Sequence, residues 1–362
     1  DGVNLWLSGH AHTDLSTTVV TPGGETAYVI ESGSKLLTAD LIKVRCTLDE
    51  NGDLTAFTLT REVFLPEEAK QEYEMDGAIA AQSEYIEAKL EEERRAVIGQ
   101  KPERSYPGKY ALYMNEFDAG RIAAGAYRLV SGADIAFENV GNFSKTYIRS
   151  GPVTWGDILD LSPYGHDVVT KQITGAELLD ILETSLEIQR QNIALYDRYL
   201  SGTVWPASAD YHLQWDGIQF IYDLSKEPGS RILYLRIGTE ELDLNKLYTV
   251  ATNSSLAVSD VYAPLATAEE TMRLCSTDQA LVRFFSQDEQ TISDAYTTRC
   301  MISKENCPHP QTKVVNEKTG ICPEFSYSGD TVCTVCGKIT AYGWHYGGYM
   351  HHYVNGVCEY CN

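Results

Sequence analysis

What the sequence lacks limits the classes of protein to which it can belong. No apolar run approaches the roughly 20 residues that a helix needs to cross a bilayer, so we expect no membrane span. Basic residues are few, because 29 Lys and Arg stand against 51 Asp and Glu, and the net charge of −22 does not suit nucleic-acid binding. The first residues, DGVNLWLSGH, contain no basic leader and no cleavage site. They enter a strand pattern at once, so we expect the chain to begin inside a domain of a longer protein.

Cysteine is the residue whose distribution divides the chain. Three of the nine cysteines, Cys46, Cys275 and Cys300, are scattered, whereas the other six lie between residues 307 and 361. That stretch is short of aliphatic residues and rich in His, Tyr and Gly, so it cannot build much of a hydrophobic core. A segment of this composition depends on a metal ion or on disulfides for its stability, and we expect a domain boundary near residue 300.

Hydrophobic periodicity predicts the elements of the first hundred residues. Residues 1–66 favour short strands, and apolar residues alternate around the turn DENGD, which is typical of a β-hairpin. Residues 67–98 favour a long helix with acidic residues in its first turn and Gly99 after its end. Its apolar stripe consists of Met75, Ile79, Ile86 and Leu90. Such a helix either links two domains or packs as an ordinary surface helix, and the pattern alone leaves both open.

Residues 104–300 contain helices and strands without a regular βαβ repeat, which predicts an α+β domain. Two capping boxes, which are pairs of side chains that satisfy the first backbone N–H groups of a helix, mark predicted helix starts. The first joins Thr174 to Glu177, and the second joins Ser276 to Gln279. The segments IQFIYDL, ILYLRIG and LYTVATN are rich in β-branched and aromatic residues and are predicted to be strands.

Two histidines, His10 and His12, follow the first predicted strand in the motif Gly-His-x-His. At the turn where a strand ends, the two imidazoles can each face one of a pair of metal ions. Ions held ~3.5–4 Å apart in this way stabilise the displacement at phosphorus in a phosphate ester. Neutral imidazole with carboxylate partners suits Zn or Mn. The motif is short, and two nearby histidines in a loop are often incidental, so both interpretations stay open on this motif alone.

The order of several segments along the chain carries more information than any one of them. In succession they resemble the end of the metallophosphoesterase domain and the C-terminal domain of the 5′-nucleotidase family, over roughly residues 3–290. The matching segments are GHAHTD, VIGQ, NEFDAGRIAAGAYR, GADIAFENVGNF, SGPVTWGDILDLSPYGHDVVTKQITGAELLDILE, QWDGIQFIYD and ILYLRIGTEELDLNKLYTVATN. The resemblance implies an α+β fold with a mixed-sheet 5′-nucleotidase C-terminal domain. The last strands of a metallophosphoesterase αββα sandwich would precede it, and a small zinc-ribbon-like module would follow.

The resemblance also implies a division into four parts and a catalytic activity. The parts are a metallophosphoesterase remnant (1–66), a linking helix (67–99), a substrate-binding domain (100–300) and a Cys/His-rich module (301–362). In the family a Gly-His-x-His element helps to bind two divalent ions, here Zn or Mn, so His10 and His12 would each ligate one. The other ligand motifs of the family, Asp-x-His, Gly-Asp and Gly-Asn-His, lie upstream and do not occur in this sequence. We therefore expect a 5′-nucleotidase-type phosphoric monoester hydrolase in the full-length protein and no activity in this part alone.

Four residues match positions at which the family binds a nucleotide. Tyr164, in SPYGHD, stands where the family has the first of two aromatic residues that stack on the base, an interaction worth ~1–3 kcal/mol. His166 replaces an asparagine beside it, and Asn139 matches an asparagine of the family's Asn-Gly-Gly element. Asp260 matches an acid that would accept the ribose hydroxyls. The alternatives are a core tyrosine for Tyr164, a surface-loop residue for His166 and a turn former for Asp260.

The sequence departs from the family in the same region. Ser255 lies near the position of the second aromatic residue, and two arginines of the family motifs are missing. Tyr113 takes the place of one arginine, and only Lys145 or Arg149 stands near the other. Lysine does not reproduce the planar, bidentate recognition of anions by arginine. These departures keep two alternatives open: a relative that acts on cyclic nucleotides or sugar nucleotides, and a non-catalytic cell-surface scaffold or binding protein that retains the fold.

The last residues contain two C-x-x-C pairs, Cys333 with Cys336 and Cys358 with Cys361, separated by 21 residues. This spacing is typical of a zinc ribbon, in which four thiolates surround one ion, although nearby histidines could replace some thiolates. The segment also resembles a Cys/His module at the ends of surface proteins of anaerobic bacteria. That resemblance implies a secreted or cell-surface bacterial protein associated with the cell wall. Disulfides among the same cysteines are the alternative for an exported protein.

Overall fold

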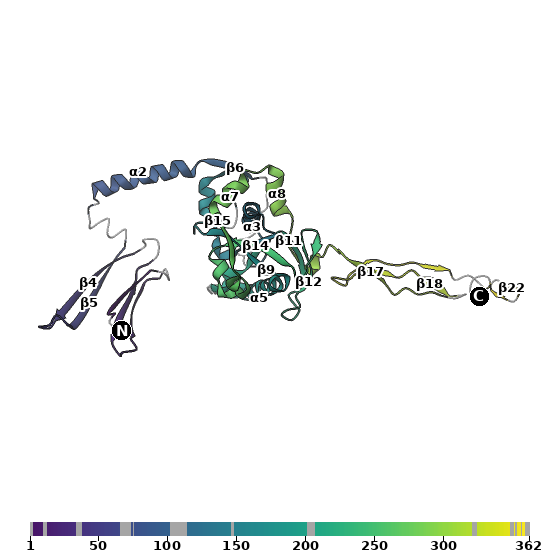
Figure 1. Cartoon of the computed structure of the whole chain (residues 1–362), viewed down its shortest axis with the longest axis horizontal. Helices are drawn as coiled ribbons and strands as arrows, with labels where there is room; N and C mark the ends of the chain where they lie inside the picture. The colour runs from purple at the N-terminus through teal and green to yellow at the C-terminus, as the bar shows by residue number, and fades with distance from the viewer. Residues whose placement is uncertain are drawn as a thin grey trace. The chain divides into compact units, whose positions relative to one another are not determined.

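The computed structural model of the chain divides into two compact units, Asp1–Leu90 and Glu91–Asn362 (Figure 1). The domain boundaries expected at residues 66, 99 and 300 stay predictions. The structure describes residues 3–9, 13–33, 38–65, 74, 76–101, 114–145, 148–200, 207–320, 324–347, 351, 353–355 and 357–358.

The first unit consists mainly of strands. A three-stranded sheet has the order β1-β3-β2, with β1 parallel and β2 antiparallel to β3, and a long hairpin joins β4 to β5. The predicted turn in DENGD is confirmed, since Asp49 Oδ1 accepts hydrogen bonds from the backbone N–H groups of Asn51 and Asp53 at 2.8 and 2.9 Å. The strands are β1 (Leu5–Ser8), β2 (Leu15–Val20), β3 (Thr26–Glu31), β4 (Ala39–Leu48) and β5 (Leu54–Phe64).

The helix that follows, α2 (Gly77–Arg94), is shorter than the predicted helix over residues 67–98. The segment VIGQ, expected at the end of the helix, belongs instead to strand β6 (Val97–Lys101), which pairs with β8 (Gly151–Thr154). This segment forms a strand because it pairs with β8, a partner distant in sequence. Gly99 also packs directly on the backbone of Phe285, where a Cβ atom would lie 2.2 Å from the carbonyl oxygen. None of the residues of α2 is buried, so its apolar stripe faces no core within the described residues.

The second unit is built on a five-stranded mixed sheet with the order β10-β7-β14-β9-β15. Figure 1 labels β9, β14 and β15 of this sheet. Side chains alternate between its faces, so Ala136 of β7 packs with helices α3 and α7, whereas Ile135 and Phe137 pack with α5. In this sheet β14 runs parallel to β7 and antiparallel to β9. The sheet contains β7 (Ile135–Asn139), β9 (Asp167–Thr174), β10 (Leu213–Asp216), β14 (Leu247–Asn253) and β15 (Glu270–Ser276). The main helices are α3 (Asp118–Ser131), α4 (Trp155–Leu161), α5 (Gly175–Leu200), α6 (Ala263–Thr267), α7 (Thr277–Phe285) and α8 (Glu289–Thr297).

A second, four-stranded sheet has the order β13-β12-β11-β16 and shares the core beneath α5. Its strands are β11 (Ile218–Tyr222), β12 (Ile232–Ile237), β13 (Glu240–Glu241) and β16 (Met301–Ser303). The described residues after this sheet form short strands, drawn in yellow in Figure 1, in three small sheets: β17-β19-β20, β18-β21 and β22-β23. These strands are β17 (Thr312–Val315), β18 (Phe325–Tyr327), β19 (Asp330–Cys333), β20 (Ile339–Ala341), β21 (His345–Gly347), β22 (Tyr353–Val354) and β23 (Val357–Cys358). The predicted α+β class with mixed sheets is confirmed, and within the described residues no helix is both long and apolar enough to span a bilayer.

One of the two predicted capping boxes is present in the structure. Thr174 Oγ1 accepts from the backbone N–H of Glu177 at 3.2 Å, and Glu177 Oε2 accepts from the backbone N–H of Thr174 at 2.7 Å, so the first box is confirmed. Ser276 does precede α7, but its side chain makes no capping hydrogen bond, so the second box is wrong. A box that the sequence analysis missed joins Thr154 to Asp157 at the start of α4.

A pair of glycine substitutions tests the packing between the two sheets. Gly217 (φ +81°) lies between β10 and β11, and a Cβ atom there would meet the carbonyl oxygen of Asp134 at 2.2 Å. Gly229 has a similar φ of +79° but open space around it. We expect Gly229→Ala to lower the free energy of unfolding by about 1–2 kcal/mol, the cost of a left-handed alanine. Gly217→Ala should lower the free energy of unfolding by about 1–3 kcal/mol more than Gly229→Ala does, because the backbone around it must shift. Equal losses in urea unfolding would contradict this packing.

Candidate substrate site

A hollow of about 280 Å³ lies at one edge of the five-stranded sheet. Because β7 and β14 are parallel, their last residues, Asn139 and Asn253, lie at the same edge of the sheet. Strand β9 runs the other way, so the residues just before it, including His166, reach that edge too. The residues that line this polar hollow are Asn139, Gly141, Asn142, Tyr164, His166, Asp210, Tyr211, Asn253, Ser255 and Leu256.

The asparagines of the polar hollow are organised by one buried carboxylate, Glu138. Alternation along β7 places Glu138 on the same face as Ala136, toward α3, where the hydroxyl of Tyr127 donates a hydrogen bond to it. Asn142 Nδ2 donates to Glu138 at 2.8 Å, and Asn253 Nδ2 donates as well. The backbone N–H of Asn139 is a further donor at 2.8 Å. Glu138 therefore connects helix α3 to three residues of the hollow.

The remaining amide atoms are also fixed. Asn253 Nδ2 donates to Asn139 Oδ1 at 3.0 Å, and Asn253 Oδ1 accepts from the backbone N–H of Leu256 at 2.8 Å. Asn139 Nδ2 donates to the backbone carbonyl of Asp210 at 3.1 Å. The asparagines thus enter a rigid network, which holds the lining of the hollow in one arrangement.

Burial changes the acid–base behaviour of two residues here. Desolvation raises the pKa of Glu138 to about 7, against the opposing effect of its hydrogen-bond donors, of which Tyr127 is the largest. Desolvation lowers the pKa of His166, and the neighbouring carboxylate of Asp167 opposes this shift. The imidazole therefore favours its neutral form, which has one N–H donor and one nitrogen acceptor.

An aromatic surface borders the polar hollow. The ring of Tyr164 is stacked with the ring of His166 at a centroid distance of 6.1 Å and an interplanar angle of 25°. Tyr164 is 57% exposed, so the alternative of a core tyrosine is wrong. Tyr211, a second aromatic residue of the lining, has its backbone carbonyl held by the hydroxyl of Tyr262 at 2.7 Å. A flat ligand placed in the hollow would meet exposed ring surface on one side and amide groups on another.

The structure brings three of the four predicted substrate-binding residues together: Asn139, Tyr164 and His166. Asp260, in a 3₁₀ turn (Asp260–Tyr262), is exposed and does not line the polar hollow, so its role with ribose stays a prediction. Asp210 brings a carboxylate-bearing side chain to the lining instead. Sequence reasoning missed it, and missed Tyr211, because neither stands in a family motif; their place directly before β10 was the available signal.

A larger hollow of about 630 Å³ also opens in the second unit, beside α3 and α8. Two of its three arginines, Arg121 and Arg128, serve the packing of the domain. Arg121 donates to Asp216 at 3.2 Å and to the carbonyl of Thr298 at 3.0 Å, and it contacts Cys300 Sγ at 2.7 Å. Arg128 pairs with the same Asp216 at 3.3 Å. This hollow offers mostly engaged charges and little exposed ring surface, so it is the weaker candidate for a planar substrate.

The predicted metal ligands divide into those that the structure describes and those that it does not. His10, His12, Cys361 and the side chain of Cys358 lie outside the described residues. Cys333 and Cys336 lie close to Cys307 and His309, two residues outside the predicted zinc ribbon. These four, which we call the Cys₃His cluster, are Cys307, His309, Cys333 and Cys336. The part of Cys358 and Cys361 in metal binding stays a prediction.

The part of the chain that carries the polar hollow is similar to a known protein family. Residues 97–264 match the family described as 5′-nucleotidase, C-terminal domain. Over 265 residues the chain is 24% identical to the trifunctional nucleotide phosphoesterase protein YfkN of Bacillus subtilis, covering 70% of this chain and 16% of YfkN. It is 25% identical to a 5′-nucleotidase-related protein of Glossina morsitans morsitans, covering 70% of this chain and 48% of that protein. The chain thus spans less than half the length of either relative.

A solved structure of similar fold comes from Staphylococcus aureus and is described as a 5′-nucleotidase. It is 17% identical to this chain, with a TM-score of 0.57, and the match covers 83% of this chain and 56% of that one. The family resemblance is thus confirmed for residues 97–264, which match the 5′-nucleotidase C-terminal domain, and the solved structure shows a similar fold.

The buried Glu138 predicts a pH dependence of stability. Its pKa of about 7 exceeds the ordinary 4.5, so the folded state binds an extra proton between these pH values. The stabilisation is complete below pH 4.5 and is lost as the pH rises through 7, and the full shift corresponds to about 3 kcal/mol. The glutamine in Glu138→Gln cannot titrate. The free energy of unfolding of the wild type in urea, measured from pH 4.5 to 8, should therefore exceed that of the variant by an amount that declines as the pH rises. A constant difference across this range would contradict the assignment.

Proposed function

We propose that the whole protein hydrolyses phosphate esters of nucleotides and that the polar hollow holds the base and ribose of the substrate. The observation that carries the proposal is the exposed Tyr164 ring beside a fixed array of asparagine amides. Stacking on an aromatic ring recognises the face of any base, and amides recognise its polar edge. The names of the relatives, a nucleotide phosphoesterase and a 5′-nucleotidase-related protein, support the same substrate class.

Each lining group has a part in this proposal. Tyr164 stacks on the base, with His166 behind it as the neighbouring ring. Asn142 and Asn253 are buried, and their amides, held by Glu138, form the rigid wall of the hollow. The half-buried Asn139 is the candidate amide for the polar edge of the base. The carboxylate of Asp210 is the candidate acceptor for ribose hydroxyls.

The catalytic metals belong to the proposal as well. Two divalent ions, Zn or Mn, would be bound in the whole protein by His10 and His12 together with ligands from outside this chain, and would activate the water that attacks phosphorus. Trp6, Leu7 and Val20 are exposed on the three-stranded sheet β1-β3-β2, and we expect another part of the whole protein to cover them. We therefore expect this chain alone to be inactive.

The cellular setting is proposed on the resemblance of the last residues to bacterial surface modules. We expect a secreted or cell-surface protein of a bacterium, associated with the cell wall, with a zinc ion in its C-terminal module. The partner is a nucleotide or a related phosphate ester, and the acidic charge of −22 argues against nucleic acid.

Two alternatives rest on the lining of the hollow. Ser255 provides no second ring at its position, and Lys145, one of two candidates for a missing arginine, is paired with Asp160. A site with fewer cations and one less ring favours either a relative acting on cyclic nucleotides or sugar nucleotides, or a non-catalytic scaffold that retains the fold. Tyr211 is the competing observation, because it supplies another aromatic residue to the lining.

A phosphate-release screen on the full-length protein separates these functions. Nucleoside monophosphates, cyclic nucleotides, UDP-sugars and a base-free phosphate ester are compared with and without a chelator. Metal-dependent release from nucleotides at higher kcat/KM than from the base-free ester is expected. Release only from cyclic nucleotides or UDP-sugars would move the substrate class to that relative, and no release from any compound would favour the scaffold.

Tyr164 provides a mutational test in the same assay. Tyr164→Ala should lower kcat/KM for nucleotides roughly 5- to 150-fold, which corresponds to the loss of one base stack. Tyr164→Phe is the matched control and should stay near the wild type, since it keeps the ring. The base-free ester should be unaffected by both variants. An equal loss on nucleotide and base-free ester would refute the stacking role.

A further inference from the structure

The Cys₃His cluster joins two segments that are distant in sequence. Cys307 and His309 follow β16, and Cys333 and Cys336 stand at the end of β19 and just after it. Their ligand atoms all lie within 4.8 Å of one another. The two sulfur atoms of Cys307 and Cys333 are 3.9 Å apart, and Cys336 Sγ lies 3.3 Å from His309 Nδ1.

These distances fit one tetrahedral ion. Ligands at ~2.3 Å for sulfur and ~2.0–2.1 Å for nitrogen, spread tetrahedrally, lie about 3.6–3.8 Å from one another. A disulfide is a different arrangement, because it joins only one pair of sulfurs at ~2.05 Å. Cys307, Cys333 and Cys336 are free thiols, and a compact set of three sulfurs and one imidazole is the donor set that zinc prefers.

The surroundings of the Cys₃His cluster support a built site. Cys333 and Cys307 are buried in a small apolar cluster with Ile221 of β11 and Ile302 of β16. The backbone N–H of His309 donates to Cys307 Sγ at 3.4 Å, a contact that stabilises a thiolate ligand. His309 itself has a φ of +58°, an uncommon backbone conformation outside glycine that brings its ring to the cysteines.

We infer that the Cys₃His cluster binds one structural zinc ion, and that this ion fastens the beginning of the C-terminal module to the sheet β13-β12-β11-β16. Two polar contacts lie at the same junction: Lys304 Nζ pairs with Asp223 at 3.0 Å, and Gln311 donates to Glu241 at 2.6 Å. The hairpins beyond this point have few buried apolar residues, so a metal ion supplies the stability that a core would otherwise give. This inference does not depend on the proposed hydrolysis of nucleotides.

Zinc content of variants tests the ligand set. The full 362-residue chain is dialysed against a weak chelator, and zinc per chain is measured by mass spectrometry. His309→Ala and Cys336→Ser, which leave the two buried cysteines in place, should each lose one zinc ion per chain relative to the wild type. Cys46→Ser and Cys275→Ser, which replace free cysteines outside the cluster, are the matched controls and should lose none.

Three outcomes would overturn the ligand set. The first is retention of the full zinc content by both cluster variants. The second is loss of the ion in Cys361→Ser but not in His309→Ala, which would favour a ribbon of four cysteines. The third is a disulfide between cluster cysteines in the mass of the purified chain. Cobalt in excess gives a second measurement, because it can refill a weakened site that loses its zinc on dialysis. In excess cobalt the thiolate-to-cobalt absorbance should fall by about one third in Cys336→Ser and persist in His309→Ala.

Hydrogen exchange tests the fastening role. Removal of zinc from the full chain by a strong chelator should speed amide exchange roughly tenfold or more in residues 304–309 and in β19, while α5 stays protected. Loss of zinc without a change at these amides would refute the fastening role and leave an ion that merely occupies the cluster.

Discussion

The buried carboxylate of Glu138 is the constraint on which the candidate site depends. It lies at the end of a central strand, fully enclosed, and takes hydrogen bonds from a tyrosine of α3, two asparagine side chains and a backbone N–H. A buried acceptor with several donors is stable only as a complete set, since loss of one partner leaves polar atoms unsatisfied. The same network that satisfies this carboxylate therefore fixes the lining of the polar hollow.

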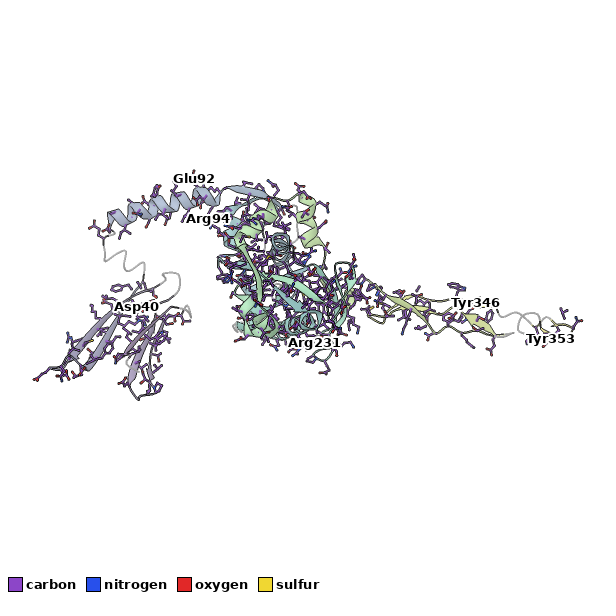
Figure 2. The ribbon with its side chains drawn as sticks, viewed as in Figure 1. Asp40, Glu92, Arg94, Arg231, Tyr346 and Tyr353 are labelled. Carbon is purple, nitrogen blue, oxygen red and sulfur yellow. The ribbon has the colours of Figure 1, made fainter. Side chains whose placement is uncertain are left out.

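Sheet topology explains why the site lies where it does. Parallel β7 and β14 end together, antiparallel β9 begins beside them, and the three strands bring residues far apart in sequence to one edge. The alternation of side chains then sends Glu138 toward α3 and leaves Asn139 at the rim. Figure 2 draws the side chains on this framework and labels Arg94, whose guanidinium pairs with Asp160 of α4 within the second unit.

Much of the fold could be predicted from sequence because its signals are local. The DENGD hairpin, the Thr174 capping box and the α+β class follow from neighbouring residues, and each is confirmed. The local pattern places VIGQ at the end of a helix, since it does not report the tertiary pairing of this segment with β8. Asp210 and Tyr211 were missed, and Cys333 was grouped with distant cysteines, for the same reason: spacing along the chain does not report which segments a folded sheet brings together.

The central claim is that the polar hollow binds a nucleotide base, and photo-crosslinking tests it most directly. The full 362-residue chain is irradiated with 8-azidoadenosine 5′-monophosphate and digested, and the labelled peptides are identified by mass spectrometry. The account predicts labelling at Tyr164 or in the peptide around Ser255, competed by unmodified AMP. Competed labelling of the peptides around Arg121 and Arg128, with none at the polar hollow, would contradict it.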